Sequence, residues 1–328
     1  MASIFITRRL PDIAIKMLEE EHDLQIYDGD APPSKEEIIA GVKEKDALIC
    51  LLTDPIDKEV IDASPSLKII ANYAVGYDNI DVEYATQKGI VVTNTPGVLT
   101  ETVADLTWAL MLSIARRICE GDEFMRQGKF KGWAPLLMLG GDIYGKTLGI
   151  VGAGRIGKAV AARAKGFNMH VIYYSRHRNK EMEKECNARY VSFDELLSRA
   201  DFISLHVPLT KETYHMIGWE ELNKMKPTAY LINTARGKCV DEEALYKALK
   251  QGIIAGAALD VFEHEPSVHD GLKKLKNVVI TPHIGSASLE TRTKMAEMVA
   301  ENVLAVLNGK KAPNCVNNEV YKRMGKKK

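Results

Sequence analysis

Three side chains suited to binding an acid and moving a proton lie in the second half of the chain. Arg236, Glu265 and His283 each follow an apolar, β-branched or alanine-rich segment by a few residues. Ligands of open α/β sheets bind beyond the carboxyl ends of the strands, so loops of this kind can face one crevice. A lone histidine, such as His206 or His215, is more often structural than catalytic. Arg, Glu and His in consecutive loops form a more specific set.

A glycine turn of the form GxGxxG precedes these loops, at Gly152, Gly154 and Gly157. The β-branched segment 147–151 runs directly into it, an amphipathic helix follows, and a second apolar segment begins at residue 171. This spacing is typical of a βαβ unit that binds a dinucleotide. The three glycines would allow the tight turn, the close approach of the pyrophosphate, and the packing of helix on strand. The phosphates would then meet the free N–H groups at the helix N-terminus.

The end of the second strand of that unit indicates which dinucleotide is bound. NAD-binding proteins usually carry Asp or Glu at this point, whereas this chain has Ser175, Arg176 and Arg178. Guanidinium groups and a hydroxyl can bind a 2′-phosphate, which a carboxylate would repel. We therefore predict that NADP(H) is preferred and that NAD(H) is possible. The alternative is that these arginines belong to a solvated loop.

Short β-branched segments alternate with amphipathic helical segments along the whole chain, which predicts an α/β protein with parallel sheets. The predicted strands fall in two series: 3–7, 23–27, 47–50, 69–72 and 91–94, then 147–151, 171–174, 202–206, 229–233, 254–260 and 278–280. Capping residues predict helix starts at Ser34, Ser192 and Asp241.

Two longer helices are predicted, from Thr100 to about Ile118 and from Ser288 to about Asn308, the latter with Gly309 near its C-cap. The second follows the last strand, so it can return to pack on the first domain. We therefore predict a discontinuous domain of residues 1–98 and 287–328, and a dinucleotide domain of residues 99–286.

Composition is that of an ordinary globular protein: 328 residues, 46% hydrophobic and 27% charged, with 44 basic and 44 acidic side chains. This balance does not indicate nucleic acid as a partner, no long apolar run indicates a membrane, and the basic tail 322–328 is expected to be a frayed end. The five cysteines include no CxxC pair, so no metal site is predicted. No signal peptide or apolar run of spanning length is visible, and we expect a cytoplasmic protein.

The chain resembles the D-isomer-specific 2-hydroxyacid dehydrogenases along nearly its whole length. The resemblance rests on residues 72–81 (NYAVGYDNID), residues 95–100 (TPGVLT), the glycine turn and the three polar loops. Within that family the chain is most similar to glyoxylate/hydroxypyruvate reductases. The resemblance implies two doubly wound parallel-sheet domains, a flavodoxin-like substrate domain and a Rossmann dinucleotide domain, with the active site in the cleft between them.

The resemblance also assigns roles at the reacting centre. Arg236 would bind the substrate carboxylate and polarise the C2 carbonyl, helped by the backbone N–H groups of Val75 and Gly76. His283 would protonate the carbonyl oxygen as hydride arrives from the nicotinamide, and Glu265 would pair with His283 and favour its imidazolium form. Glu265 is chosen over the nearby Glu263 because the family pattern places the catalytic Glu directly before a proline.

Asp260 would hold the nicotinamide carboxamide, and Pro208 and Thr213 would lie along the adenosine. The full set expected at the cofactor is Thr102, Gly152, Gly154, Arg155, Ile156, Gly157, Ser175, Arg176, Arg178, Val207, Pro208, Thr213, Thr234, Ala235, Asp260, His283 and Gly285.

The expected reaction is the NADPH-dependent reduction of a small 2-oxo acid, glyoxylate and hydroxypyruvate first. Another specificity within the family, such as 2-ketogluconate or D-lactate, stays open, as does a dinucleotide-sensing corepressor that shares the fold. By resemblance we expect a homodimer joined through the cofactor domains. Trp133, Leu136, Leu137 and Met138 can form an apolar lid over the substrate, which the partner subunit could contribute, or can be ordinary packing residues.

Overall fold

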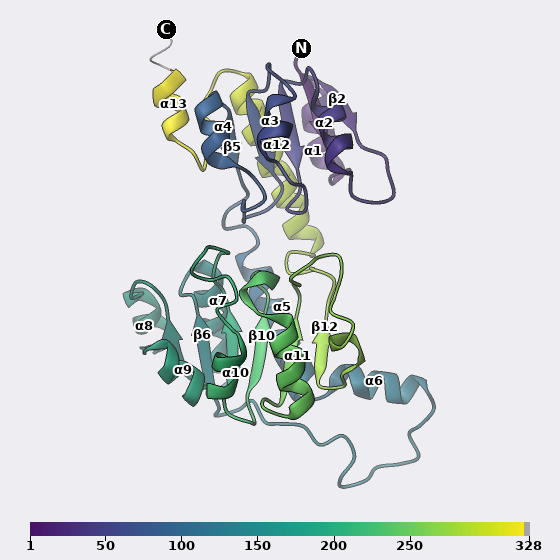
Figure 1. Cartoon of the computed structure of the whole chain (residues 1–328), viewed down its shortest axis with the longest axis vertical. Coiled ribbons are helices and arrows are strands. Elements are labelled where there is room, and N and C mark those ends of the chain that lie inside the picture. Colours follow the sequence, from purple (N-terminus) through teal and green to yellow (C-terminus); the bar gives the residue numbers. More distant parts are fainter. Residues whose placement is uncertain (325–328) are drawn as a thin grey trace. The chain divides into compact units, whose positions relative to one another are not determined.

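The computed structural model describes residues 1–324, and the end of the basic tail, 325–328, lies outside the described residues. The chain divides into two compact units (Figure 1). Unit 1 comprises Met1–Leu99 and the chain from Ala287 onward, and unit 2 comprises Thr100–Ser286.

Unit 1 is a five-stranded parallel sheet with the strand order β2-β1-β3-β4-β5. This is the order of flavodoxin-like doubly wound sheets, which agrees with the predicted fold class. The strands are β1 (Ser3–Ile6), β2 (Asp23–Ile26), β3 (Ala47–Cys50), β4 (Ile69–Asn72) and β5 (Val91–Thr93). The helices are α1 (Asp12–Glu19), α2 (Lys35–Val42), α3 (Lys58–Asp62), α4 (Val82–Lys88), α12 (Leu289–Leu307) and α13 (Glu319–Met324).

Both faces of the unit 1 sheet are covered, which is why β3 and β4 are buried along their whole length. Helices α2, α3 and α4 share one apolar cluster with the sheet, and α12 packs against α1, β3 and β4. The Ser34 side chain accepts a hydrogen bond from the Glu37 backbone N–H at 3.2 Å and starts α2 with a capping box, as predicted.

Unit 2 is a seven-stranded parallel sheet with the order β12-β11-β10-β9-β6-β7-β8, which is the Rossmann order extended by one strand. The strands are β6 (Thr147–Val151), β7 (His170–Tyr174), β8 (Arg189–Tyr190), β9 (Phe202–Leu205), β10 (Tyr230–Asn233), β11 (Gly256–Leu259) and β12 (Val278–Ile280). The α-helices are α5 (Thr100–Ala115), α6 (Ile118–Arg126), α7 (Arg155–Arg163), α8 (Lys180–Cys186), α9 (Phe193–Arg199), α10 (Trp219–Lys224) and α11 (Glu242–Gln251). Short 3-10 turns are η1 (Ala164–Phe167), η2 (Gly237–Cys239) and η3 (Leu272–Lys274).

Two apolar layers enclose the unit 2 sheet. One layer packs α5, α7 and α8 against it and the other packs α9, α10 and α11, so neighbouring strand residues such as Leu231 and Ile232 enter different layers. Two details differ from the sequence prediction. The helix predicted to reach Ile118 ends at Ala115, because Arg117 adopts a left-handed φ of 54° and the chain restarts as α6. The two-residue strand β8 was not predicted, because it is too short to show a periodic pattern.

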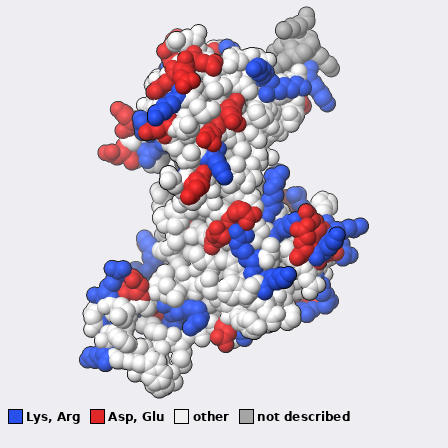
Figure 2. Space-filling model, turned by 180° about the vertical axis from the view of Figure 1, so that it is seen from behind, with Lys and Arg blue, Asp and Glu red and all other residues white. Residues whose placement is uncertain are grey.

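Lys and Arg are interspersed with Asp and Glu on the face of the molecule shown in Figure 2. Within residues 1–324, no helix combines the length and the apolar character that a membrane span needs.

Candidate active site

The predicted acid and its partner form a short hydrogen bond in unit 2. His283 Nδ1 lies 2.8 Å from Glu265 Oε2, and the other carboxylate oxygen accepts the Phe262 N–H at 2.9 Å. Both side chains are about three-quarters buried, with 27% and 22% of their surfaces exposed. With Nδ1 engaged by Glu265, the Nε2 atom of His283 is the nitrogen available to a substrate.

The environment of Glu265 favours its charged form. Burial by itself raises the pKa of the Glu265 carboxyl. The opposing effects are larger: the hydrogen bond and charge of His283, the Phe262 N–H and the charge of Arg236 all lower that pKa. The pKa of Glu265 therefore lies below its usual value. Glu265 is therefore a carboxylate at neutral pH, placed to accept a hydrogen bond from Nδ1 of His283.

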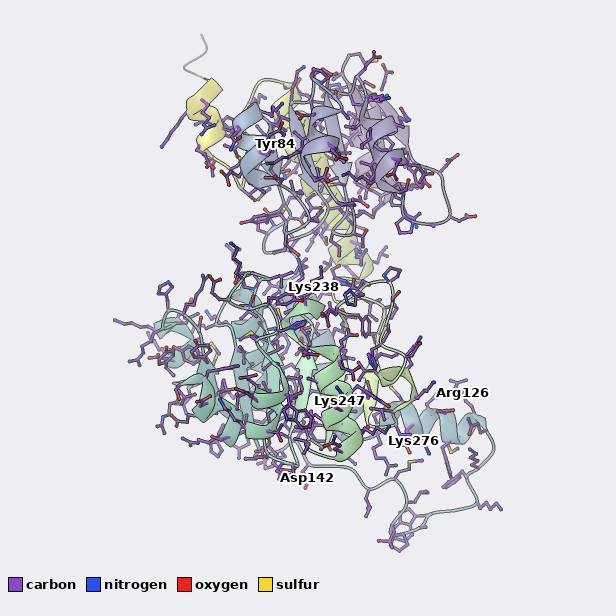
Figure 3. All side chains as sticks on the ribbon, in the orientation of Figure 1. Tyr84, Arg126, Asp142, Lys238, Lys247 and Lys276 are labelled. Atoms are coloured by element: carbon purple, nitrogen blue, oxygen red, sulfur yellow. The ribbon has the colours of Figure 1, made fainter. Side chains whose placement is uncertain are left out.

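Arg236 and Glu265 lie on loops that pack directly against each other. A Cβ atom on Gly237 would lie 1.8 Å from the backbone carbon of Phe262, so only glycine permits this approach. The Asn233 side chain fixes the loop after β10 by donating to the Arg236 carbonyl at 3.0 Å and accepting from the Ala235 N–H at 3.0 Å. Lys238, two residues beyond Arg236, marks this end of the sheet in Figure 3, opposite to Asp142.

The turn that carries His283 is held by Asp260. Asp260 Oδ1 accepts from the Thr281 hydroxyl at 2.6 Å and the Ile284 N–H at 2.8 Å, and Oδ2 accepts from the Gly285 N–H at 2.8 Å. His283 itself has a left-handed φ of 54°, a strained conformation for a residue with a side chain. Asp260 is 1% exposed, and its burial raises the pKa of the carboxyl against these hydrogen bonds. Both of its oxygens thus position the turn, while its predicted contact with the cofactor stays a prediction.

The glycine turn has the geometry that the sequence indicates. Gly152 has a φ of +102°, and a Cβ there would lie 2.5 Å from the carbonyl oxygen of His206. Gly157 leaves no room for a side chain, because its Cβ would lie 2.1 Å from the Gly152 carbonyl oxygen. Gly154 caps α7, and the space around its missing side chain is open. An open, glycine-lined helix N-terminus fits the pyrophosphate of a dinucleotide, which the N–H groups near Arg155 and Ile156 would bind.

The two arginines predicted to bind the 2′-phosphate both lie on the loop after β7, but their surroundings differ. Arg178 forms a two-point ion pair with Glu183, with both N–O distances at 2.9 Å, and stacks over Tyr190. Arg176 is exposed, and no ion pair engages it in the described part of the chain. Of the two guanidinium groups, Arg176 is the more accessible to a phosphate next to Ser175, although its charge also interacts with Glu212.

The remaining residues predicted at the cofactor lie on loops beyond β9 and β10. Thr213 closes a turn by donating to the Pro208 carbonyl at 2.7 Å and accepting from the Thr210 N–H at 2.8 Å. Thr234 lies 3.0 Å from the Thr107 hydroxyl, which ties the loop after β10 to α5. Val207 and Ala235 pack partly buried at the edge of the apolar layer under α9–α11, and Thr102 lies in the first turn of α5.

Sequence reasoning missed a charged cluster that holds the loop of Glu265. The buried Glu242 carboxylate accepts the N–H groups of Glu263 at 2.7 Å and His269 at 3.3 Å. Glu263 in turn lies 2.7 Å from Nε2 of His215. The only hint in the sequence is Glu263, a second glutamate close to Glu265. Its partners Glu242 and His215 are distant in sequence, so the cluster is visible only in the folded chain.

Val75 and Gly76, predicted to bind the substrate carboxylate, lie in unit 1 in the loop after β4.

Comparisons with known proteins agree with this geometry. The chain matches the model described as "D-isomer specific 2-hydroxyacid dehydrogenase, NAD binding domain" over residues 108–285, within unit 2. It is 59% identical to a glyoxylate reductase of Korarchaeum cryptofilum and 54% identical to one of Pyrococcus horikoshii, covering 97% of each chain.

Among solved structures, the TT0316 protein of Thermus thermophilus superposes with a TM-score of 0.91 at 47% identity, covering 96% of this chain and 99% of that one. An NADPH-dependent glyoxylate/hydroxypyruvate reductase of Sinorhizobium meliloti, solved with NADP and malonate, gives 0.87 at 34% identity and covers 96% of both chains.

The Rossmann sheet with its glycine turn, together with these relatives, defines an NAD(P)-dependent oxidoreductase. The chain belongs to the D-isomer specific 2-hydroxyacid dehydrogenase family, and the prediction made from its motifs is confirmed.

Proposed function

We propose that this protein reduces glyoxylate to glycolate, and hydroxypyruvate to D-glycerate, with NADPH as the preferred reductant. The observation that carries the proposal is the 2.8 Å pair of His283 and Glu265 on loops adjoining that of Arg236. The names of the relatives support the substrate, since glyoxylate reductases from several archaea are 51–59% identical to this chain.

Arg236, His283 and Glu265 have separate roles in the proposed reaction. Arg236 binds the substrate carboxylate in two-point fashion and withdraws electron density from the neighbouring carbonyl. A dihydronicotinamide dinucleotide held at the glycine turn of Gly152, Gly154 and Gly157 would supply the hydride for the carbonyl carbon, with the carbonyl π-electron pair passing to oxygen. His283 delivers the proton from Nε2 to that oxygen, so that C–H and O–H bonds form and a hydroxyl results. Glu265 stabilises the imidazolium before transfer.

A small substrate is favoured because the charged groups serve a single carboxylate. The experiment is steady-state turnover of glyoxylate, hydroxypyruvate, pyruvate and a branched 2-oxo acid, each with NADPH and with NADH. Highest kcat/KM for glyoxylate or hydroxypyruvate is expected. Fastest turnover of the branched acid would contradict the proposed substrate.

The preference for NADPH rests on Ser175 and the exposed Arg176, because Glu183 already occupies Arg178. Arg176→Ala is expected to lower kcat/KM for NADPH by about tenfold or more, the worth of a charge-assisted contact, and to leave NADH nearly unchanged. Lys180→Ala, which removes another exposed positive charge shortly after Arg176 in the sequence, is the matched control. A clear NADH preference of the unmodified protein would overturn this part of the proposal.

We also propose a cytoplasmic homodimer joined through the cofactor domains. All five cysteines are free thiols, which suits a reducing compartment. The segment between α6 and β6 carries large apolar side chains in water: Trp133 is 85% and Leu136 79% exposed, so these two side chains are not part of the core of unit 2. Exposed apolar clusters of this kind are typical of interfaces, and a partner subunit would cover them.

A further inference from the structure

Three successive carbonyl groups of the loop after β4 are held by groups from the body of unit 1. The Ala74 carbonyl accepts the Thr95 N–H at 2.9 Å. The Val75 carbonyl accepts Nδ2 of Asn94 at 2.7 Å, and the Gly76 carbonyl accepts Nδ2 of Asn72 at 2.7 Å.

These contacts determine where the loop's N–H groups point. In a planar trans peptide the N–H lies opposite to the carbonyl, so a held carbonyl fixes the N–H of the next residue. The N–H groups of Val75, Gly76 and Tyr77 therefore face away from the groups that hold Ala74, Val75 and Gly76. Within residues 1–324 none of these three N–H groups donates a hydrogen bond. Oriented backbone N–H groups without a protein acceptor are suited to an anion.

The two asparagines are placed rigidly. Asn72 ends β4 and Asn94 directly follows β5, and the register of these neighbouring strands pairs Ala71 with Thr93, so the two asparagines lie side by side at one edge of the sheet. Asn72 is 0% and Asn94 8% exposed. Rotation of either amide would leave its polar atoms buried without partners, which is costly.

A third asparagine connects this loop to the preceding one. Asn79 Oδ1 lies 3.3 Å from Nδ2 of Asn72, and Asn79 Nδ2 donates to the carbonyls of Leu51 and Asp54, each at 3.0 Å. The loops after β3 and β4 are thereby fixed to each other.

We propose that Asn94 and Asn72 are positioning residues that preset the loop N–H groups for the substrate carboxylate, Asn94 through the Val75–Gly76 peptide. This inference rests on the proposed function and on the expectation from the family resemblance that the Val75 and Gly76 N–H groups help Arg236 to bind that carboxylate. A neutral N–H attracts an anion only along its own direction, unlike the charge of Arg236, so carboxylate binding depends on the orientation that the asparagines impose. Sequence motifs do not reveal this role, because asparagine after a strand is also common in ordinary turns.

The test compares Asn94→Ala, which removes the donor, with Asn94→Ser, which restores a shorter one. KM for glyoxylate and the Ki of oxalate, a dicarboxylate that resembles glyoxylate, are measured at saturating NADPH. The Kd of NADPH is measured by fluorescence. In Asn94→Ala we expect KM and Ki to rise about tenfold or more, as for a hydrogen bond to a charged group, while the NADPH Kd stays within about twofold. Asn94→Ser is expected to recover part of the loss.

Asn317→Ala is the matched control, because Asn317 is also 0% exposed and holds unit 1 through Val92, Thr86 and Ile90. It is expected to lower thermal stability without raising KM. An unchanged KM in Asn94→Ala, or an equal rise in Asn317→Ala, would overturn the positioning role even though glyoxylate is reduced. If the unmodified protein reduces another 2-oxo acid instead, the proposed substrate fails, and the same comparison is made with that acid.

Discussion

His283 combines two properties that packing alone does not require, a left-handed backbone and a carboxylate partner at 2.8 Å. Asp260 maintains that backbone through three hydrogen bonds to the turn. Strain maintained in this way is common at functional sites, where it orients a reacting side chain. The side chain proposed as the proton donor is thus held in place by the protein itself.

Replacing His283 by Ala is expected to lower kcat by about 10²- to 10⁴-fold, the usual contribution of a general acid. The Kd of NADPH is expected to change little, because the glycine turn and the loop after β7 remain intact. His264→Ala, in the loop of Glu265 but with its side chain 76% exposed, is the control and should retain full activity. Full turnover in His283→Ala would remove His283 from the mechanism.

His206 gives the protein a pH-dependent stability that is separate from catalysis. Burial lowers the pKa of the His206 imidazole from 6.5 to about 3, and its Nε2 lies 2.9 Å from the Ser204 hydroxyl. The folded pKa is below the unfolded one, so this contribution to stability is present above pH 6.5 and is lost as the pH falls from 6.5 toward 3.

Urea unfolding of the unmodified protein and of His206→Gln at about pH 7 and pH 5 tests this. From pH 7 to pH 5, the free energy of unfolding of the unmodified protein relative to His206→Gln should fall by about 1–2 kcal/mol. We expect about 1 kcal/mol, because the His206 side chain is only partly shielded from water. A difference between the two proteins that does not vary with pH would contradict it.

At the scale of elements, the site depends on how closely the loops after β10 and β11 approach each other. Gly237 lies against the backbone of Phe262, and Glu242 at the start of α11 holds the backbone of Glu263. The two contacts fix the loops of Arg236 and Glu265 in one arrangement, although neither Gly237 nor Glu242 takes part in the reaction.

Gly237→Ala is therefore expected to force the two loops apart. Overpacking of this kind costs about 1–3 kcal/mol, and displacement of the arginine relative to the acid should lower kcat/KM by more than about tenfold. Gly166→Ala in the same unit is the control, because nothing lies within 4 Å of its Cβ position. Chemical denaturation and steady-state kinetics give both values, and an active Gly237→Ala of normal stability would refute the argument.

At the scale of the whole molecule, the segment between α6 and β6 exposes several large apolar side chains, and we propose that a second copy of the chain covers them. The side chains of Phe130, Trp133, Leu136 and Leu139 are 48–85% exposed. Burying such an apolar cluster between two copies is favourable at about 25 cal/mol per Å².

Trp133→Glu is expected to dissociate the proposed dimer, as measured by sedimentation equilibrium, because it places a charge in an apolar interface. Trp219→Glu changes another exposed tryptophan of unit 2 outside this segment and should leave the assembly intact. A monomeric unmodified protein, or a dimeric Trp133→Glu, would contradict the proposed interface.

The sequence by itself determined the class of fold, nearly all strands and the set of candidate residues. Strands buried on both faces read as apolar runs, and glycine, capping and charged residues have local signatures that survive without tertiary context. The short strand β8 and the break at Arg117 have no such signature, because neighbouring elements impose them.

Tertiary structure decided which of the candidate side chains are free to act. Both arginines after β7 look equivalent in sequence, but Glu183 engages Arg178 and leaves Arg176 exposed. Likewise Asp260 is committed to the turn of His283, and Asn72 and Asn94 hold carbonyls in a loop that their positions in the sequence do not mark. The residue types determine which reactions and contacts are chemically possible. Hydrogen bonds between segments that are distant in sequence determine which side chains are already engaged and how the others are oriented, and these bonds exist only in the folded chain.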